Sequence, residues 1–129
     1  MVDAFIISLS AANALNFSLS KAFSGCAGSL RECGCIWGQS VGRPIDSSLD
    51  WFTKKFAVYT GRLAKACESL DHIEGGDFRT LMLGELVDIV KLIVVEAAAR
   101  DLELEALFEK RLNDLEERNV FYTMRKNSL

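Results

Sequence analysis

Hydrophobic residues recur along this chain at intervals of three and four positions, the spacing that places side chains on one face of an α-helix. Residues 49–70 show the pattern most clearly, since their apolar positions are Leu49, Phe52, Phe56, Tyr59, Leu63, Ala66 and Leu70. The segment Asp46 to Ser48 precedes them as a helix-capping sequence, and Gly75-Gly76 follows as a helix stop. We therefore predict a helix that begins near residue 49 and ends before Gly75.

The residues after Gly76 predict two more helices. Asp77 is a typical helix-capping residue, and a strongly apolar segment runs from Phe78 to about Arg100. A further helix is expected within residues 101–126. Its inward-facing positions would be Leu104, Leu107, Phe108, Leu112, Leu115 and Phe121.

The first 48 residues are less regular. A helix within residues 3–23 is predicted by the spacing of Phe5, Leu9, Ala12, Leu19 and Phe23, with Asn16 as the polar member of the stripe. Residues 24–48 are rich in glycine, serine and cysteine, and they are long for an unstructured connection. This segment is either a functional loop or a short helix that the pattern does not reveal.

These elements predict an all-α fold without strands. We expect a single helical domain over residues 1–129, built as an antiparallel bundle of about four helices joined by short turns. Residues 1–48 would supply the first helix and the long loop, and residues 49–120 the helical core. The apolar residues of the third helix, together with Phe5, Phe17 and Phe23, are more than one protomer readily covers, so we expect a homodimer or a larger homo-oligomer.

Composition narrows the classes of function. The net charge of −3 among 129 residues does not favour a general nucleic-acid binder, which would show a basic face. Apolar runs stay shorter than the roughly 18–20 residues of a membrane span. The first residues carry Asp3, and Asn13, Asn16 and Lys21 interrupt their apolar stretch, which is not typical of a secretory leader. We therefore expect a cytoplasmic protein without nucleic-acid or membrane partners.

Four cysteines stand at positions 26, 33, 35 and 67. The chain is not a short, cysteine-dense secreted sequence, so we expect Cys26, Cys33, Cys35 and Cys67 to be free thiols. A zinc site built from this group and His72 is the alternative. The spacing lacks the paired C-x2-C knuckles of structural zinc sites, and we therefore expect no zinc.

Three acids interrupt the apolar third helix on one side. At 100° per residue, Glu85, Asp88 and Glu96 fall within one sector, together with Leu92. They could form a solvated stripe, with Glu85 favoured near the helix start. They could instead lie inside the bundle, where a metal ion or another cation would have to balance them.

The segment GELVDIVKLIVVEAAARDLELEALFEKRLNDLEERN resembles the second half of the MazG-like all-α nucleoside triphosphate pyrophosphohydrolases. Members of that family carry an E-x-x-D motif at the start of the third helix, which Glu85 and Asp88 match. The resemblance implies Mg²⁺ held by these two acids and by Glu96. It also implies phosphate contacts on the fourth helix, where the matching residues are Lys110, Arg111, Asn113 and Arg118.

The chain departs from this family at its first motif. An E-E-x-x-E sequence on the second helix normally supplies further metal ligands, and here Val58, Tyr59 and Arg62 take those places. In an antiparallel hairpin that turns near Gly75, Arg62 would lie near Asp88. We therefore expect an ion pair between Arg62 and Asp88, or between Arg62 and Glu85. The same geometry places Glu68 level with Met82, at the turn end of the bundle.

Three functions remain open from the sequence. The first is a divergent pyrophosphohydrolase that cleaves a nucleoside triphosphate to a monophosphate and pyrophosphate, with Mg²⁺ activating water and Trp37 or Trp51 stacking on the base. The second is a non-catalytic relative that binds nucleotides or serves as a structural oligomer. The third is an unrelated helical interaction protein. Metal binding separates the first from the others, and nucleotide binding separates the second from the third.

Overall fold

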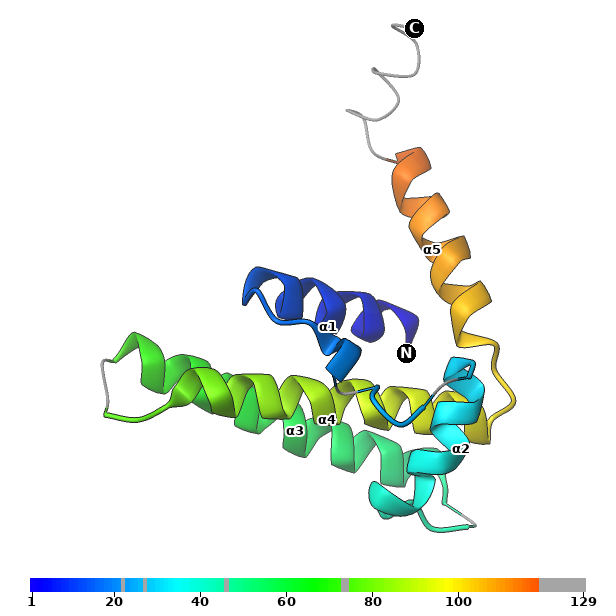
Figure 1. Cartoon of the computed structure of the whole chain (residues 1–129), viewed down its shortest axis with the longest axis horizontal. Coiled ribbons are helices and arrows are strands. Elements are labelled where there is room, and N and C mark those ends of the chain that lie inside the picture. Colours follow the sequence, from blue (N-terminus) through cyan, green and yellow to red (C-terminus); the bar gives the residue numbers. More distant parts are fainter. Residues whose placement is uncertain (22, 27, 46, 73–74, 119–129) are drawn as a thin grey trace, which may run out of the picture.

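The computed structural model describes residues 1–21, 23–26, 28–45, 47–72 and 75–118. These residues form five α-helices, one short 3-10 helix and no strand, so the prediction of an all-α fold is confirmed (Figure 1). The elements are α1 Val2–Ala14, η1 Leu19–Lys21, α2 Leu30–Ser40, α3 Leu49–Asp71, α4 Phe78–Ala99 and α5 Leu104–Arg118. Within this part of the chain, no helix combines the length and the apolar character that crossing a membrane requires.

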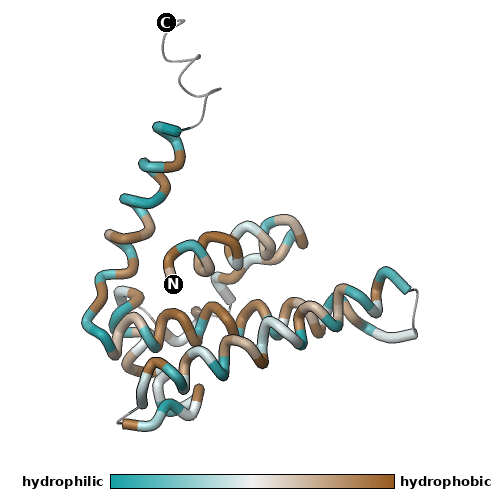
Figure 2. Tube along the Cα trace, turned by 180° about the vertical axis from the view of Figure 1, so that it is seen from behind, coloured by the Kyte–Doolittle hydropathy of each residue, from teal (hydrophilic) through white to brown (hydrophobic). Residues whose placement is uncertain are grey.

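Helix α4 is the centre of the structure. It runs antiparallel beside α3, while α2 crosses its carboxyl-terminal half and α1 lies along another side (Figure 1). Leu92 and Ile93 have no exposed surface, and α4 is apolar along most of its length, whereas apolar and polar residues alternate along α5 (Figure 2). The predicted α3–α4 hairpin is therefore present, with α4 as the helix that the others cover.

The ends of the hairpin helices follow local capping chemistry. The side chain of Asp77 accepts a hydrogen bond from the backbone N–H of Thr80 at 3.1 Å and so caps α4 as predicted. Ser48 stands at the start of α3 without a side-chain hydrogen bond to the helix. Asp46, the first residue of the predicted capping sequence, lies outside the described residues.

The amino-terminal helix is shorter than predicted. Helix α1 ends at Ala14, and Asn16 adopts a positive φ of 49°, a conformation that interrupts a right-handed helix. The chain then turns through η1 and brings the ring of Phe23 within 5.0 Å of the Trp37 ring. Phe23 thus reaches the core from a loop and not from α1.

Residues 24–48 contain helix α2, the second of the two predicted alternatives. Ser29 and Glu32 form a capping box at its start, in which each side chain accepts a hydrogen bond from the other residue's backbone. Gly34 lets α2 approach α4 closely, since a Cβ atom at this position would lie 2.5 Å from the Cβ of Ala98. The glycine is therefore required by packing.

The prediction that all four cysteines are free thiols is wrong for two of them. Cys26 and Cys33 form a disulfide with their Cα atoms 5.4 Å apart, because α2 turns Cys33 inward beside the loop that carries Cys26. Cys35 and Cys67 are free and exposed. Because its sulfur is part of the disulfide, Cys33 is not available to bind a zinc ion together with His72.

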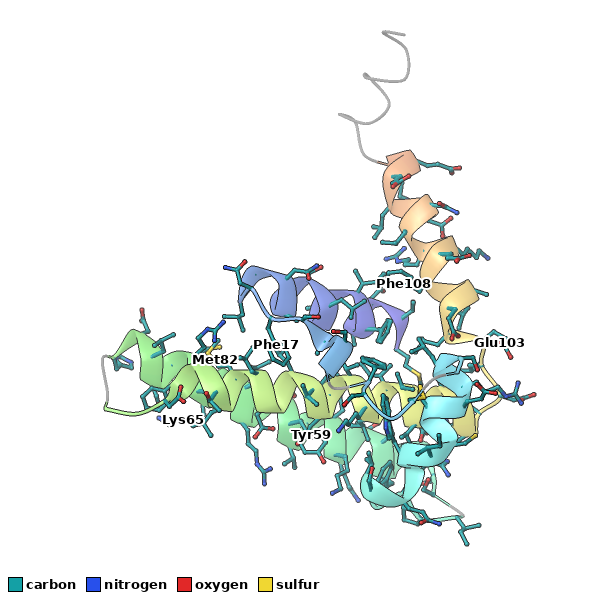
Figure 3. The ribbon with its side chains drawn as sticks, viewed as in Figure 1. Phe17, Tyr59, Lys65, Met82, Glu103 and Phe108 are labelled. Carbon is teal, nitrogen blue, oxygen red and sulfur yellow. A yellow bond between two sulfur atoms is a disulfide. The ribbon has the colours of Figure 1, made fainter. Side chains whose placement is uncertain are left out.

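The prediction that the apolar residues of the last helix face inward is only partly right. Leu104 is buried, and the ring of Phe108 meets that of Phe5 at 5.8 Å. Leu107 and Leu115 remain 40% and 41% exposed, Leu107 in the first turn of α5 and Leu115 where the helix runs away from the others (Figures 1 and 3). Phe121, also predicted to face inward, lies outside the described residues. At the ends of α3, the predicted inward positions Leu49 and Leu70 are exposed as well.

The close approach at Gly34 leads to a testable prediction. Gly34→Ala should lower the free energy of unfolding by about 1–3 kcal/mol because α2 must move away from α4. In the matched control Gly38→Ala, the new Cβ meets nothing within 4 Å. That variant should be stabilised by about 0.5–1 kcal/mol through helix propensity. Urea denaturation of both variants measures the difference, and a stabilised Gly34→Ala protein would contradict the close approach.

Candidate functional site

The face shared by α3 and α4 carries the residues of the predicted E-x-x-D motif. The Nη1 atom of Arg62 on α3 lies 4.0 Å from Oε1 of Glu85 on α4, which is an ion-pair distance. Arg62 is thus paired with Glu85, and the described residues show no ion pair between Arg62 and Asp88, the other predicted partner. Toward the turn end of the hairpin lie Lys65 and Met82 (Figure 3), and Lys65 pairs there with Glu68 at 3.4 Å. Arg62 therefore meets Glu85, which lies about one helical turn before the predicted neighbour Asp88 on α4.

The two acids of the motif have different surroundings. Asp88 is exposed, whereas the side chain of Glu85 is 17% exposed and its Oε2 atom is buried without a hydrogen-bond partner. Burial raises the pKa of Glu85, Arg62 opposes this effect, and the negative charge of Asp88 adds to it. Burial, and then Asp88, also raise the pKa of Tyr59, which is partly buried on α3. The site therefore disfavours negative charge at Glu85.

This set of residues does not fit a Mg²⁺ site. Magnesium prefers several oxygen ligands in octahedral geometry, and catalytic sites of this kind surround it with carboxylates. The residues of α3 at this level are Val58, Tyr59 and Arg62, and a guanidinium is the group nearest to Glu85. Among the described residues, no three His, Cys, Asp or Glu side chains come together in a way that could hold a metal ion.

Glu96, predicted as a third metal ligand, lies in a different part of the structure. Eleven residues separate it from Glu85, which corresponds to about 16 Å along α4. Its side chain has no exposed surface. Its Oε2 atom accepts a hydrogen bond from Nε of Arg43 at 3.1 Å, and its Oε1 atom accepts one from Nε of Arg100 at 2.6 Å. Glu96 is therefore the centre of a buried ion triad, and both of its oxygens are already occupied by cations.

The residues predicted to contact phosphates are also remote from Glu85. Lys110, Arg111 and Asn113 lie on α5, which meets α1 and the amino-terminal end of α2 (Figure 1). Nε of Arg111 donates to the carboxylate of Asp3 at 2.6 Å, while Lys110 and Asn113 are exposed. Within one protomer, α5 brings none of these three side chains to the α3–α4 face.

Trp37, one of the two tryptophans predicted to stack on a base, is a core residue. It is 8% exposed, it packs against Phe23, and the Nζ atom of Lys91 lies 5.6 Å from the centre of its ring. The Trp37 ring is thus in contact with other residues of the core. Trp51 differs, because it lies in the first turn of α3 and lines a cleft.

Two adjoining clefts flank Arg62. The first has a volume of about 330 Å³ and is lined by Trp51, Lys54, Lys55, Val58, Tyr59 and Arg62. The second, of about 240 Å³, extends from Arg62 and Glu85 toward Lys65, Ser69 and Phe78. In the first cleft the Nζ atom of Lys55 lies 5.9 Å from the centre of the Tyr59 ring. The two clefts together combine aromatic rings with basic side chains. We name the surface formed by Trp51, Lys54, Lys55, Tyr59, Arg62 and Lys65 the basic face of α3.

The sequence analysis did not identify the basic face of α3. Its signal is present, since Lys54, Lys55, Arg62 and Lys65 alternate with Trp51 and Tyr59 at helical spacing. Two of these cations have acidic partners on the same helix: Asp50 binds Lys54 at 2.7 Å and Glu68 binds Lys65. Among the described residues, Lys55 has no acidic partner, and Arg62 meets Glu85 of α4 only at 4.0 Å.

Comparisons of this chain with protein-family models, with curated proteins and with solved structures found no match. The resemblance to the MazG-like pyrophosphohydrolases therefore stays a prediction from the sequence.

The two buried glutamates of α4 should respond in opposite ways to the loss of charge. Glu96→Gln should lower the free energy of unfolding by about 3 kcal/mol, because two guanidinium groups lose their carboxylate. Burial favours the protonated form of Glu85, so its stabilising contribution is complete below the pKa of the unfolded chain and is lost as the pH rises through the folded pKa. Glu85→Gln should therefore gain stability relative to the parent as the pH rises above the ordinary glutamate value of 4.5.

Thermal melts of the parent and of the two variants across this pH range measure both effects. Replacement of Asp88, which is exposed on the same helix, by Asn is the control and should change the melting temperature little. Equal losses of stability in Glu85→Gln and Glu96→Gln would contradict the different surroundings of the two carboxylates.

Proposed function

We propose that this chain is a non-catalytic relative of the MazG-like nucleoside triphosphate pyrophosphohydrolases and that it binds a nucleotide without a metal ion. One observation carries the proposal. At the level of Glu85, where the family motif would place further carboxylates on α3, the chain places Tyr59 and Arg62, and the Arg62 guanidinium lies 4.0 Å from the Glu85 carboxylate. A basic group occupies the position of a metal ligand.

The charge of the basic face of α3 supports direct binding of phosphates. Metal ions in a carboxylate site bridge two sets of negative groups, the acids and the phosphates. When α3 carries lysine and arginine instead, the phosphates can bind to the protein without that bridge. Lys55 and Arg62 would hold the phosphates, and Trp51 or Tyr59 offers an aromatic face for the base. Glu85, whose ionisation is disfavoured by burial, opposes this less than an exposed acid would.

Titration with a non-hydrolysable nucleoside triphosphate tests the proposal. Trp37 is buried, so a change in tryptophan fluorescence would report mainly on Trp51. We expect saturable binding that is unchanged or weaker in the presence of Mg²⁺, because Mg²⁺ competes with the side-chain cations for the phosphates. Hydrolysable triphosphates should yield no pyrophosphate. Binding that requires Mg²⁺, or release of pyrophosphate, would favour the divergent pyrophosphohydrolase instead.

Arg62→Ala is the variant that locates the nucleotide. The Arg62 side chain is 62% exposed, so the substitution should cost less than about 1 kcal/mol of stability and leave the fold intact. Loss of a charge-assisted hydrogen bond should weaken nucleotide binding about tenfold. Lys110→Ala on α5 removes an exposed cation remote from the clefts and should leave the affinity unchanged. Equal affinities of the two variants would contradict the site.

We also propose that the protein forms a homodimer or a larger homo-oligomer. The support is the exposed apolar surface of α1 and α5, where Ile7 is 67% exposed and Leu107 and Leu115 are each about two-fifths exposed. An amphipathic helix that leaves its own protomer presents such a stripe for a partner helix.

Light scattering at micromolar concentration should give a mass of at least twice the 14.3 kDa of one chain. Leu107→Glu combined with Leu115→Glu should shift the protein toward the monomer, because charge would enter the apolar interface. Leu70→Glu is the control, since Leu70 is also exposed but lies at the far end of α3. A parent protein that is monomeric under these conditions would refute the assembly.

A further inference from the structure

A cavity of about 390 Å³ lies between α2 and the carboxyl-terminal half of α4, apart from the basic face of α3. Its walls are mainly apolar and come from Gly34 and Gly38 of α2, from Pro44 and Ile45, and from α4. The α4 residues are Val95, Ala98 and Ala99. The volume is within the range of small-molecule sites, which are typically apolar with a few placed polar groups.

The shape of the cavity follows from the two glycines of α2. Gly34 lies in close contact with α4, whereas a Cβ atom at Gly38 would meet nothing within 4 Å. Helices α2 and α4 therefore touch at Gly34 and have separated by Gly38, one helical turn further along α2. No side chain of the described residues fills the space beside Gly38, which leaves the hollow open to a ligand.

Among the described residues, Arg43 is the one charged residue that lines this cavity. Its side chain is 15% exposed, its Nε atom donates to Glu96, and its Nη1 atom donates to the carbonyl oxygen of Pro44 at 3.3 Å. No partner among the described residues contacts its Nη2 atom. The two N–H donors of Nη2 are therefore unpaired among the described residues, in a side chain that lines the cavity.

The charge balance around Arg43 favours an anion. Two guanidinium groups, those of Arg43 and Arg100, share the single carboxylate of Glu96, which leaves one net positive charge in the triad. The acids nearest in sequence to Arg100 are Asp101 and Glu103, and both pair with Arg31 of α2, which offsets their charge.

We propose that the cavity beside Gly38 binds a small organic anion, with its carboxylate or phosphate head on Arg43 and a short aliphatic tail against Val95 and Ala98. A guanidinium whose Nη2 donors have no partner among the described residues is suited to oxygen anions of this kind, and the apolar lining residues offer contacts to an aliphatic tail. The head alone would lose the apolar contacts, and the tail alone would leave the excess positive charge unbalanced. Both parts of the ligand are therefore needed.

Nuclear magnetic resonance titration of the ¹⁵N-labelled full chain tests this site, with hexanoate as the probe. We expect saturable shifts of the Arg43 Nε–H signal and of the Gly38 amide, with a Kd of about 1 mM for a ligand of this size. Acetate carries the head without the tail, and hexanol carries the tail without the head. Each should bind at least about tenfold more weakly than hexanoate. Hexyl phosphate in a parallel arm identifies the preferred head group.

Gly38→Leu is the decisive variant, because it fills the cavity without altering the triad of Glu96. It should abolish the hexanoate shifts at Arg43, while Gly61→Leu, at a glycine of α3 that also has open space around it, should retain them. The dispersion of the spectrum shows that each variant is folded. Hexanoate binding that survives Gly38→Leu, equal binding of hexanol, or shifts confined to the lysines of α3 would each overturn the proposal.

Discussion

Helix α4 sets the constraint on which the rest of this structure depends. A helix of 22 residues that is apolar on nearly every side is stable in water only when other elements cover all of its faces. Helix α3 covers one face as the antiparallel partner, and α1 covers another. The carboxyl-terminal half still needs a third cover, and α2 supplies it by approaching closely at Gly34. The need to cover α4 thus explains why the irregular segment between residues 24 and 48 contains a helix.

The same burial determines the role of each acid on α4. Glu96 lies where three elements meet, so its charge must be balanced within the protein, and Arg43 and Arg100 do this from both sides. Arg43 thereby fixes the connection between α2 and α3 to the central helix. Glu85 lies closer to the turn, where its cover is incomplete, and it meets only the outer part of Arg62. Identical side chains on one helix therefore have different functions because different elements cover them.

The features that could be predicted from the sequence are those that depend on local or regular geometry. The cap at Asp77 and the α3–α4 hairpin follow from short-range patterns and from the pairing of antiparallel helices. The same geometry placed Arg62 near Asp88, whereas its observed partner is Glu85, the alternative that was predicted for the ion pair. Sequence patterns did not predict the ion pair between Arg43 and Glu96, whose partners are 53 residues apart. Such a contact leaves no periodic trace in the sequence. The disulfide was missed for a different reason, because Cys26 and Cys33 are only seven residues apart but their pairing depends on how α2 turns Cys33 toward the core.

The stripe of α5 shows a further limit of sequence patterns. An amphipathic repeat indicates that a helix has an apolar face, but it does not tell whether the covering surface belongs to the same chain or to another. Leu104 is buried and the Phe108 ring meets Phe5 of α1, whereas the described residues leave Leu107 and Leu115 about two-fifths exposed. Contacts with α1 reach as far as Arg111, so the exposure of Leu107 reflects the side of the helix that it occupies, and Leu115 follows the last of these contacts. Such exposed leucines are the physical reason for proposing a partner helix on α5.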